Sequence, residues 1–484
     1  MTCPYCDRAI WDGSIQCPFC GAPVRPSGSR ARGCSHAPGH PDFTPLPKAA
    51  PHRTKRFVLP LVLALVFLLV VIPCCAALLS VLHTEARTEP VTPAFSALSE
   101  SETVSTPSRT EPPQPDEHED LLPEASAAAY LRAEEIFPDF SSCYYLSRLS
   151  DADLNVACLL YEAAMRFDTQ CALPEHVSES SFTNVFFLLE FDCPELLQLD
   201  FASSVSYTTD RLTGDVSSVT LPYRMSQSEY QSASEACLSV IDSLKAYADG
   251  MTALEREFLV YDYLTGSCVY DADSAYVETA YGALVNGRAK CDGVTYAVTW
   301  ALRELGVPCI SVGAYPADGS IGHAWNLVRL EGTYYALDVT ANLFEEGDEP
   351  FSLYLYCNVP DSALLCTYPV LDDCIVWAGG LPEAESMDMN YYVLTGRYVS
   401  SGADYSDLLD ALFTEAYDTA GYFTLQFEDA DELRDLCAHI SDELDTWQAA
   451  NGIDVVIYSC APLYEEGCNI LYMSLEPETE SQAA

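Results

Sequence analysis

A cysteine, a histidine and an aspartate occur within one stretch of this chain, in local settings suited to acyl transfer by a cysteine nucleophile. They are Cys291, His323 and Asp338. A thiol needs a neighbouring imidazole to become a thiolate, and the imidazole needs a carboxylate that fixes its tautomer and stabilises its charged form. The three residues are therefore a chemical set, which the folded chain must bring together.

The sequence around Cys291 predicts the start of a helix. Apolar residues recur at helical spacing over residues 294–305, Gly306 supplies a stop, and the segment before Cys291 is turn-like. Unpaired backbone N–H groups and the helix dipole at such a position favour a thiolate. Lys290 and Arg288 are expected to add positive charge with the same effect.

The histidine and the aspartate are predicted to lie on neighbouring strands of a hairpin. Residues 307–315, 323–330 and 333–340 read as strands, the last two joined by a two-residue turn. That turn sets a register in which His323 faces Thr340. Because side chains alternate between faces, His323 and Asp338 share one face on a diagonal, with about 7–8 Å between their backbones. Their side chains are therefore expected to meet.

These segments resemble the transglutaminase-like superfamily, whose papain-like core has a cysteine at a helix start and a histidine and an aspartate on adjacent antiparallel strands. The resemblance covers about residues 252–345 and is carried by Tyr261 to Leu264, Tyr281 to Gly287, Cys291 to Gly293, His323 to Asn326 and Tyr334 to Thr340. It implies an α+β fold with the cysteine-bearing helix packed on an antiparallel sheet. It also implies that Cys291 is the nucleophile, His323 the general base and acid, and Asp338 the orienting carboxylate.

A simpler interpretation makes Cys291 a small buried hydrophobe and His323 a hairpin residue with a satisfied imidazole. Only four histidines lie beyond the N-terminal portion of the chain, at positions 118, 176, 323 and 439. One of them falls at the place that the chemistry requires. This coincidence favours the catalytic interpretation.

Charge divides the chain into two parts at an apolar segment. Residues 1–82 carry 8 Lys+Arg and 3 Asp+Glu, a net charge of +5, whereas the rest carries 15 and 69, a net charge of −54. Residues 57–82 are apolar apart from two prolines and a serine, and at about 1.5 Å per residue they exceed the roughly 30 Å of a bilayer core. They are predicted to form one transmembrane helix. Basic residues precede it, so the N-terminus is expected in the cytoplasm and the acidic bulk outside the cell.

The N-terminus carries two Cys-x-x-Cys pairs, formed by Cys3, Cys6, Cys17 and Cys20. Four thiolates can hold one tetrahedral Zn²⁺, and so short a segment has too little core to fold without a metal. The segment resembles the zinc-ribbon modules found at the N-terminus of many bacterial membrane proteins. A structural zinc is therefore predicted here, with iron and a cytoplasmic binding partner as open alternatives, and no cofactor is predicted for the catalytic core.

Composition and apolar pattern suggest the remaining boundaries. The predicted organisation is a zinc ribbon (1–22), a basic Pro-rich linker (23–56), the transmembrane helix (57–82), a disordered stalk (83–125), an α+β exterior region (126–250), the catalytic core (251–345), a connecting segment (346–388) and a C-terminal α/β domain (389–484). In the exterior region, helices are predicted near 127–135, 151–166 and 226–248, and strands near 185–191, 203–208 and 217–222. The C-terminal domain reads as strand, helix, strand, helix, strand, strand from residue 391, and suggests a sandwich of ferredoxin-like type.

Charge and location narrow the function. Strong negative charge argues against nucleic-acid binding by the exterior part. We expect a single-pass surface enzyme acting on peptide or carboxamide groups, with cell-wall peptides and surface proteins the nearest substrates by location. Peptidase, amidase and crosslinking transferase all fit, because the acceptor of the acyl group is open. The alternative is a catalytically silent scaffold that binds peptide through the same fold.

Fourteen cysteines lie beyond residue 82, and thirteen remain when Cys291 is set aside. An odd number leaves at least one thiol unpaired within the chain. Their spacing does not reveal which of the others pair.

Overall fold

The computed structural model describes the chain from residue 126 onward, with short gaps. The described ranges are 126–174, 176–203, 205–314, 322–343, 353–367, 379–418, 421–465 and 468–477. The predicted zinc ligands Cys3, Cys6, Cys17 and Cys20 lie outside these ranges, as do the linker, the predicted membrane segment and the stalk. Within the described ranges, no helix has the length and apolarity needed to cross a bilayer, and no group of histidine, cysteine or acidic side chains is arranged to hold a metal ion.

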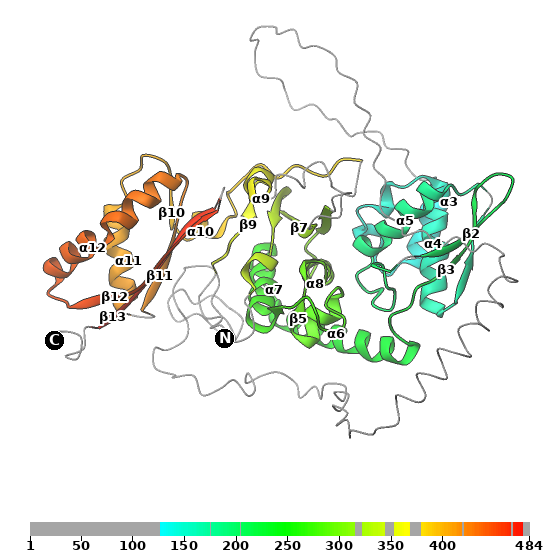
Figure 1. Ribbon diagram of the computed structural model, residues 1–484, viewed down its shortest axis with the longest axis horizontal. Coiled ribbons are helices and arrows are strands. Elements are labelled where there is room, and N and C mark those ends of the chain that lie inside the picture. The colour runs from blue at the N-terminus through cyan, green and yellow to red at the C-terminus, as the bar shows by residue number, and fades with distance from the viewer. Residues whose placement is uncertain are drawn as a thin grey trace, which may run out of the picture.

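The first described region, residues 126–250, combines helices with a small antiparallel sheet of order β1-β3-β2 (Figure 1). Its elements are α3 (Ala127–Ile136), η2 (Phe140–Ser142), η3 (Leu146–Arg148), α4 (Asp151–Arg166), β1 (Gln170–Ala172), α5 (Glu179–Asp192), β2 (Ser206–Thr209), β3 (Val216–Thr220) and α6 (Gln227–Tyr247). Each α-helix begins after a serine whose hydroxyl accepts a backbone N–H of the first turn, which fixes where the helix starts.

The strand predicted at residues 185–191 is wrong, because this segment is the second half of α5. Nearly every side of the helix is buried, and the buried apolar residues are Phe182, Val185, Phe186, Leu188, Leu189 and Phe191. A run with so few polar positions carries neither a helical nor a strand period. The signal for a helix was instead Ser178, which caps α5 by accepting the backbone N–H of Ser181.

The next region centres on α8, the helix that begins with Cys291. Its elements are α7 (Ala253–Ser267), β4 (Val269–Tyr270), η4 (Gly282–Asn286), β5 (Arg288–Ala289), α8 (Cys291–Glu304), β6 (Cys309–Ala314), β7 (His323–Leu330), β8 (Thr333–Leu337), η5 (Thr340–Asn342), β9 (Cys357–Val359) and α9 (Asp361–Thr367). The large sheet is antiparallel with the order β6-β7-β8-β9, and α8 packs on β6 and β7 (Figure 1). Strand β9 comes from the segment predicted only to connect two domains.

The β7–β8 hairpin has the predicted register, with Asn326 opposite Leu337. The two turn residues, Glu331 and Gly332, have φ of 50° and 93°, as a type I′ turn requires. The ladder ends at Leu337, because the chain bends into η5 at Thr340. The predicted pairing of Thr340 with the first residue of β7 is therefore not formed.

Residues 389–477 form a further α/β unit. Its elements are α10 (Tyr391–Leu394), β10 (Tyr398–Val399), α11 (Ser406–Asp418), β11 (Tyr422–Phe427), α12 (Ala430–Asn451), β12 (Val455–Glu465) and β13 (Cys468–Pro477). The strand predicted at 391–394 is a helical turn capped by Asn390, whose side chain accepts two backbone N–H groups. The order β-α-β-α-β-β and the sheet order β10-β11-β13-β12 exclude the predicted ferredoxin-like type, whose order is β-α-β-β-α-β.

Helices cover one face of the C-terminal sheet, and other residues of the sheet contact the central region. Alternate residues of β11 and β13, such as Phe423 and Met473, form one core with α11 and α12. Ile470 on β13 belongs instead to the larger core that contains α8. Three stacked tyrosines also link the two regions: the ring centroids of Tyr261 and Tyr354 lie 4.9 Å apart, and those of Tyr354 and Tyr391 lie 3.8 Å apart.

Candidate active site

Cys291 is the first residue of α8 and is partly exposed. The first N–H groups of a helix have no intrahelical acceptor, so they remain able to bind a negative charge beside the sulfur. Gly293 lets this end of the helix lie against the preceding loop, because a Cβ at that position would be 2.3 Å from the carbonyl oxygen of Val277. The predicted placement of the cysteine at a helix start is confirmed.

His323 and Asp338 meet as the hairpin register predicts. Nε2 of His323 lies 2.7 Å from Oδ2 of Asp338, whose side chain is completely buried. The other carboxylate oxygen accepts the backbone N–H of Ala341 at 3.3 Å. Asn342 holds the backbone here, since its Nδ2 donates to the carbonyl oxygens of Asp338 and Leu355 at 3.2 and 2.9 Å. Besides its contact with the ring, the carboxylate is therefore held by one backbone N–H group, and the backbone that carries it is held by Asn342.

The side chain of Cys291 lies close enough to the ring of His323 to raise the pKa of that ring. Because Nε2 of the ring faces Asp338, Nδ1 is the nitrogen left for the thiol. The sulfur also lies 3.8 Å from Oδ1 of Asp292, the next residue of α8. The structure therefore brings the three predicted residues together in the order sulfur, imidazole, carboxylate.

The charge of His323 is set by opposing effects. Burial lowers the pKa of the ring, but the charge of Asp338 and the hydrogen bonds to Asp338 and Cys291 outweigh it and raise the pKa to about 10. The ring is therefore an imidazolium at neutral pH. An imidazolium beside a sulfur stabilises a thiolate and holds a proton ready for a leaving group.

Trp325 lies next to the His323 ring on the same face of β7. The two rings are nearly parallel, with 19° between their planes and 6.2 Å between their centroids, and Trp325 itself is buried. Its indole limits how far the His323 ring can turn. A stacked ring of this kind keeps the imidazole aimed at both partners.

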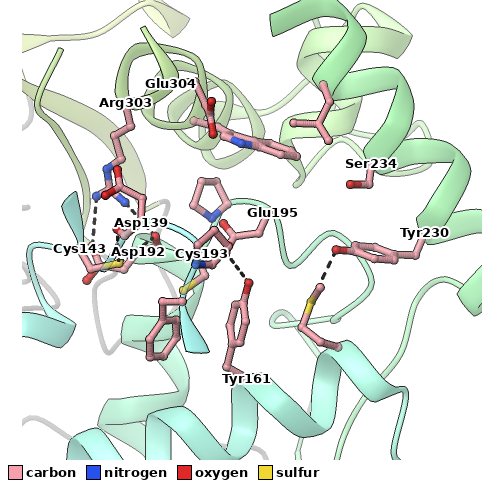
Figure 2. A pocket seen from close by; sticks show the side chains of 16 residues that line it. Asp139, Cys143, Tyr161, Asp192, Cys193, Glu195, Tyr230, Ser234, Arg303 and Glu304 are labelled. Carbon is pink, nitrogen blue, oxygen red and sulfur yellow. Dashed lines mark hydrogen bonds and ion pairs between the residues drawn. The ribbon is translucent and has the colours of Figure 1, made fainter. Parts of the chain in front are cut away.

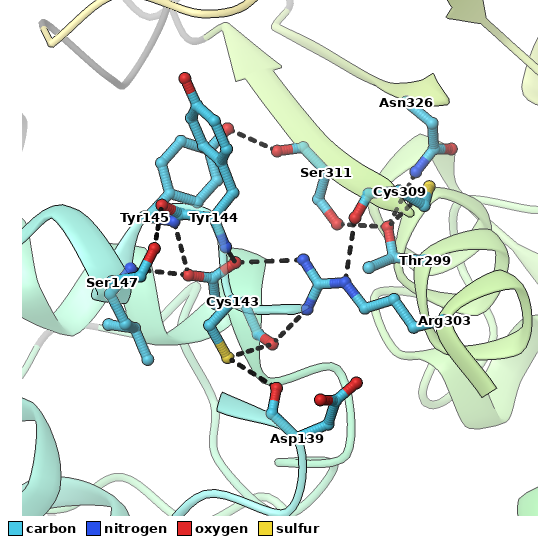
Figure 3. Close-up of polar contacts among 12 residues, drawn as sticks. Asp139, Cys143, Tyr144, Tyr145, Ser147, Thr299, Arg303, Cys309, Ser311 and Asn326 are labelled. Carbon is cyan, nitrogen blue, oxygen red and sulfur yellow. Dashed lines mark hydrogen bonds and ion pairs between the residues drawn. The ribbon is translucent and has the colours of Figure 1, made fainter. Parts of the chain in front are cut away.

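Asn326 ties the histidine strand to the cysteine helix. Its Nδ2 donates to the carbonyl oxygen of Thr295 at 3.1 Å and to Oγ1 of Thr299 at 2.9 Å, and Oγ1 of Thr299 lies 2.7 Å from Oγ of Ser311 on β6 (Figure 3). All these groups are buried. Sequence reasoning assigned Asn326 no role, although an amide in an otherwise apolar strand signals a buried polar partner.

A buried ion pair holds the opposite end of α8. Arg303 Nη2 lies 3.1 Å from Oδ1 of Asp192 at the end of α5, and its Nε and Nη1 donate to the carbonyl oxygens of Cys309 and Asp192 at 2.9 and 2.8 Å (Figure 3). The Asp192 carboxylate also accepts the backbone N–H groups of Tyr144 at 3.0 Å and of Tyr145 and Leu146 at 2.8 Å. The region before the core thus anchors the helix that carries the nucleophile.

The positive charge expected from Lys290 and Arg288 is compensated by neighbouring carboxylates. Nζ of Lys290 lies 2.7 Å from Oε1 of Glu278, and Nη1 of Arg288 lies 2.8 Å from Oδ2 of Asp271. Burial and then the charge of Asp292 raise the pKa of Glu190 to about 8. The positive charges expected from Lys290 and Arg288 are thus present, but within ion pairs.

Comparison with known proteins gives a match over this region. Residues 244–339 match the family model of the transglutaminase-like superfamily. A crystal structure of a TGase is similar at 14% identity over 31% of this chain and 48% of that chain, with a TM-score of 0.22. A candidate protease from Parabacteroides distasonis is similar at 9% identity over 56% of each chain, with a TM-score of 0.21. Comparison with curated proteins gave no match.

The chain spans about half the length of each of these solved structures. The family match includes the whole of α8, β6, β7 and β8, and with them Cys291, His323 and Asp338. Residues 244–339 therefore form a transglutaminase-like domain.

Proposed function

We propose that this protein is a cysteine acyl-transfer enzyme, with Cys291 as nucleophile, His323 as general base and acid, and Asp338 as the carboxylate that orients the ring. The observation that supports it most is the continuous contact from the thiol through the imidazole to a buried carboxylate. A merely structural histidine needs one hydrogen-bond partner. This ring has a partner on each side, in the order that cysteine catalysis uses.

The reaction begins when the Cys291 thiolate attacks a peptide or carboxamide carbonyl, and the carbonyl oxygen becomes an oxyanion. Backbone N–H groups at the start of α8 are placed to stabilise that charge. His323 then gives its proton to the departing amine, the C–N bond breaks, and a thioester remains on Cys291.

The second half of the reaction releases the acyl group. An acceptor attacks the thioester, the neutral His323 ring takes its proton, and the imidazolium and thiolate are restored. Water as acceptor gives a peptidase or amidase, and an amine gives a crosslinking transferase. The burial of Asp338 keeps its carboxylate beside the ring through both steps.

We also propose that the enzyme is anchored in the cell membrane by residues 57–82, with the catalytic region outside and a zinc ribbon of Cys3, Cys6, Cys17 and Cys20 in the cytoplasm. The sequence supports this arrangement through the long apolar run, the basic residues before it and the paired Cys-x-x-Cys motifs. Peptide or protein substrates at the cell surface, including cell-wall peptides, follow from that location.

The topology can be tested in intact cells with a protease that does not cross the membrane. Cleavage of the region after residue 126, with the segment before residue 56 protected, is the expected result. Protection of both parts, or cleavage of both, would contradict the arrangement. Metal analysis of the purified full-length chain should find one zinc per molecule, which Cys3→Ala removes.

Alkylation rates provide the test of the nucleophile. Cys437 and Cys460 are also partly exposed, so they serve as internal reference thiols. Iodoacetamide should modify Cys291 roughly tenfold faster or more than either reference, because only its thiolate is stabilised by an imidazolium. In His323→Gln this advantage should disappear while the reference rates stay the same. Equal rates in the unmodified protein would contradict the proposal.

A catalytically silent peptide-binding scaffold is the remaining candidate. A panel of activated esters and peptide amides separates the two functions, since an enzyme forms an acyl adduct on Cys291 that hydroxylamine releases. The adduct should be absent in Cys291→Ala. Peptide binding without any adduct in the unmodified protein would favour the scaffold.

A further inference from the structure

Two thiols face one cavity at the far end of α8. Cys143 follows η2, and Cys193 ends α5, and both are almost completely buried. The sulfur of Cys143 lies 3.9 Å from the carbonyl oxygen of Asp192, the residue bonded to Cys193, so the two cysteines are neighbours in space. Both also line a cavity of about 250 Å³ whose walls include Tyr161, Tyr230 and Trp300 (Figure 2). Trp300 and Arg303 belong to α8, so this cavity lies well away from Cys291, about 18 Å along the helix.

We propose that Cys143 and Cys193 are a modification site that forms an internal disulfide bond. The two positions are far apart in sequence but are fixed against each other by Asp192. That carboxylate accepts the backbone N–H groups of Tyr144 and Tyr145, the residues directly after Cys143, and Cys193 is its own chain neighbour. A frame that already holds the two cysteines at one cavity limits the movement needed to reach the bond length of about 2.05 Å.

Burial makes both thiols harder to ionise than exposed ones. Cys143 Sγ donates toward two carbonyl oxygens, those of Asp139 at 3.6 Å and Asp192 at 3.9 Å. Although the neighbouring Cys193 lowers it, burial and the charge of Asp192 leave the pKa of Cys143 raised, and burial raises the pKa of Cys193 well above its ordinary value. The reaction therefore begins when either cysteine loses its proton.

The bond can form by exchange with a small disulfide that enters the cavity. One of the two cysteines loses its proton to solvent and attacks one sulfur of the reagent as a thiolate, the reagent's S–S bond breaks, and one thiolate leaves. The other cysteine then loses its proton to solvent and attacks the mixed disulfide on the first, which releases the second thiolate. Two protein thiols are oxidised to one disulfide, and one small disulfide is reduced to two thiols.

The disulfide would strengthen the support of the catalytic helix. It joins the end of α5 to the segment whose backbone N–H groups bind Asp192, and Asp192 in turn binds Arg303 on α8. Cross-linking residues this far apart in sequence restricts the unfolded chain and so stabilises the folded one. The proposal does not depend on catalysis by Cys291.

A second thiol pair supplies an internal reference for the experiment. Cys437 on α12 and Cys460 on β12 also lie near each other, since burial and then Cys437 raise the pKa of Cys460, and both are more exposed than the proposed pair. Cys237 provides the matched control, because it is completely buried and lies on α6, away from both pairs in sequence. Its replacement by alanine removes one buried thiol without touching either pair.

The test treats the purified full-length chain with bis(2-hydroxyethyl) disulfide, alkylates the remaining thiols and maps the peptides without reduction. A peptide pair linked through Cys143 and Cys193 should appear, and it should be lost in Cys143→Ala and in Cys193→Ala but kept in Cys237→Ala. Oxidation should also raise the Tm, and this rise should shrink in the same two variants.

The Cys437–Cys460 link shows whether the reagent has acted. If that link forms while Cys143 and Cys193 are both recovered as alkylated thiols, the proposal is overturned. Cross-links from either residue to a different cysteine would overturn it as well. Both outcomes are read in the unmodified protein, so they do not depend on whether a variant folds.

Discussion

At each end of α8, a basic side chain lies against a buried carboxylate. At the start, His323 binds Asp338 beside the partly exposed sulfur of Cys291. At the end, Arg303 binds Asp192, and both side chains are almost completely buried. An imidazolium can give its proton to a reacting group, whereas a guanidinium keeps its charge. The same arrangement is therefore suited to proton transfer at one end and to fixed attachment at the other.

The comparison predicts its largest effect for Asp338→Asn. The amide keeps the shape of the carboxylate but loses the charge that holds His323 as an imidazolium, so we expect kcat/KM to fall by about 10²–10⁴-fold. The Tm should change much less. Activity against the best substrate from the acyl-donor panel and thermal unfolding provide the two measurements.

Asp192→Asn is the matched variant, and it should show the reverse pattern. An unchanged kcat/KM for Asp338→Asn would remove the distinction between the two ends, as would an Asp192→Asn variant that loses activity without losing stability.

Arg303→Met should cause the largest loss of stability. Removing one partner of a buried ion pair leaves an unpaired charge on Asp192, a change that typically costs about 3–5 kcal/mol. Denaturant unfolding of the full-length chain measures it. Arg166→Met is the control, because its ion pair with Asp168 lies at the surface and should contribute far less to stability. Similar losses in the two variants would contradict the structural role of the buried pair.

Asn326→Ala tests the connection between helix and sheet. The substitution leaves the hydroxyl of Thr299 and the carbonyl of Thr295 without the amide, so we expect a loss of about 1–3 kcal/mol in the free energy of unfolding. The rate at which iodoacetamide modifies Cys291 should fall too, because the helix and the histidine strand are less firmly aligned. A stability loss without any change in this rate would limit Asn326 to a structural role.

The smallest effect concerns pH. The folded-state pKa of His323 is raised to about 10 from 6.5, so its stabilising contribution is complete below pH 6.5 and is lost as the pH rises through about 10. The Tm of the unmodified protein should therefore fall over this window by more than the Tm of His323→Gln. Parallel Tm curves for the two proteins would contradict the raised pKa.

The sequence predicted the positions of the three site residues better than the contacts that hold their helix and strands in place. The helix start at Cys291 and the hairpin register depend on local signals, Gly306 after the helix and a Glu331-Gly332 turn, and both were predicted correctly. The ion pair between Arg303 and Asp192 joins residues that are 111 apart in sequence, and no local sequence pattern indicates it. The carboxylate partners of Lys290 and Arg288 were missed for a similar reason, since they come from a loop that precedes them.

Elements with weak periodicity account for the other errors. Helix α5 was taken for a strand because its apolar residues leave no polar face, and α10 is too short for a helical period to be visible. The predicted order of elements in the C-terminal unit was close to the observed one, but it was given the wrong fold type. An element order alone does not determine how strands are arranged in a sheet.

The stack of Tyr261, Tyr354 and Tyr391 sets a practical limit on dividing this chain. A protein shortened to the family-matching residues 244–339 would keep one of the three rings and expose its face to water, and it would also lack β9, the edge strand of the main sheet. Such a fragment should aggregate through its bare sheet edge and its uncovered aromatic surface. Expression of the transglutaminase-like domain in soluble form therefore calls for a C-terminal boundary beyond residue 394.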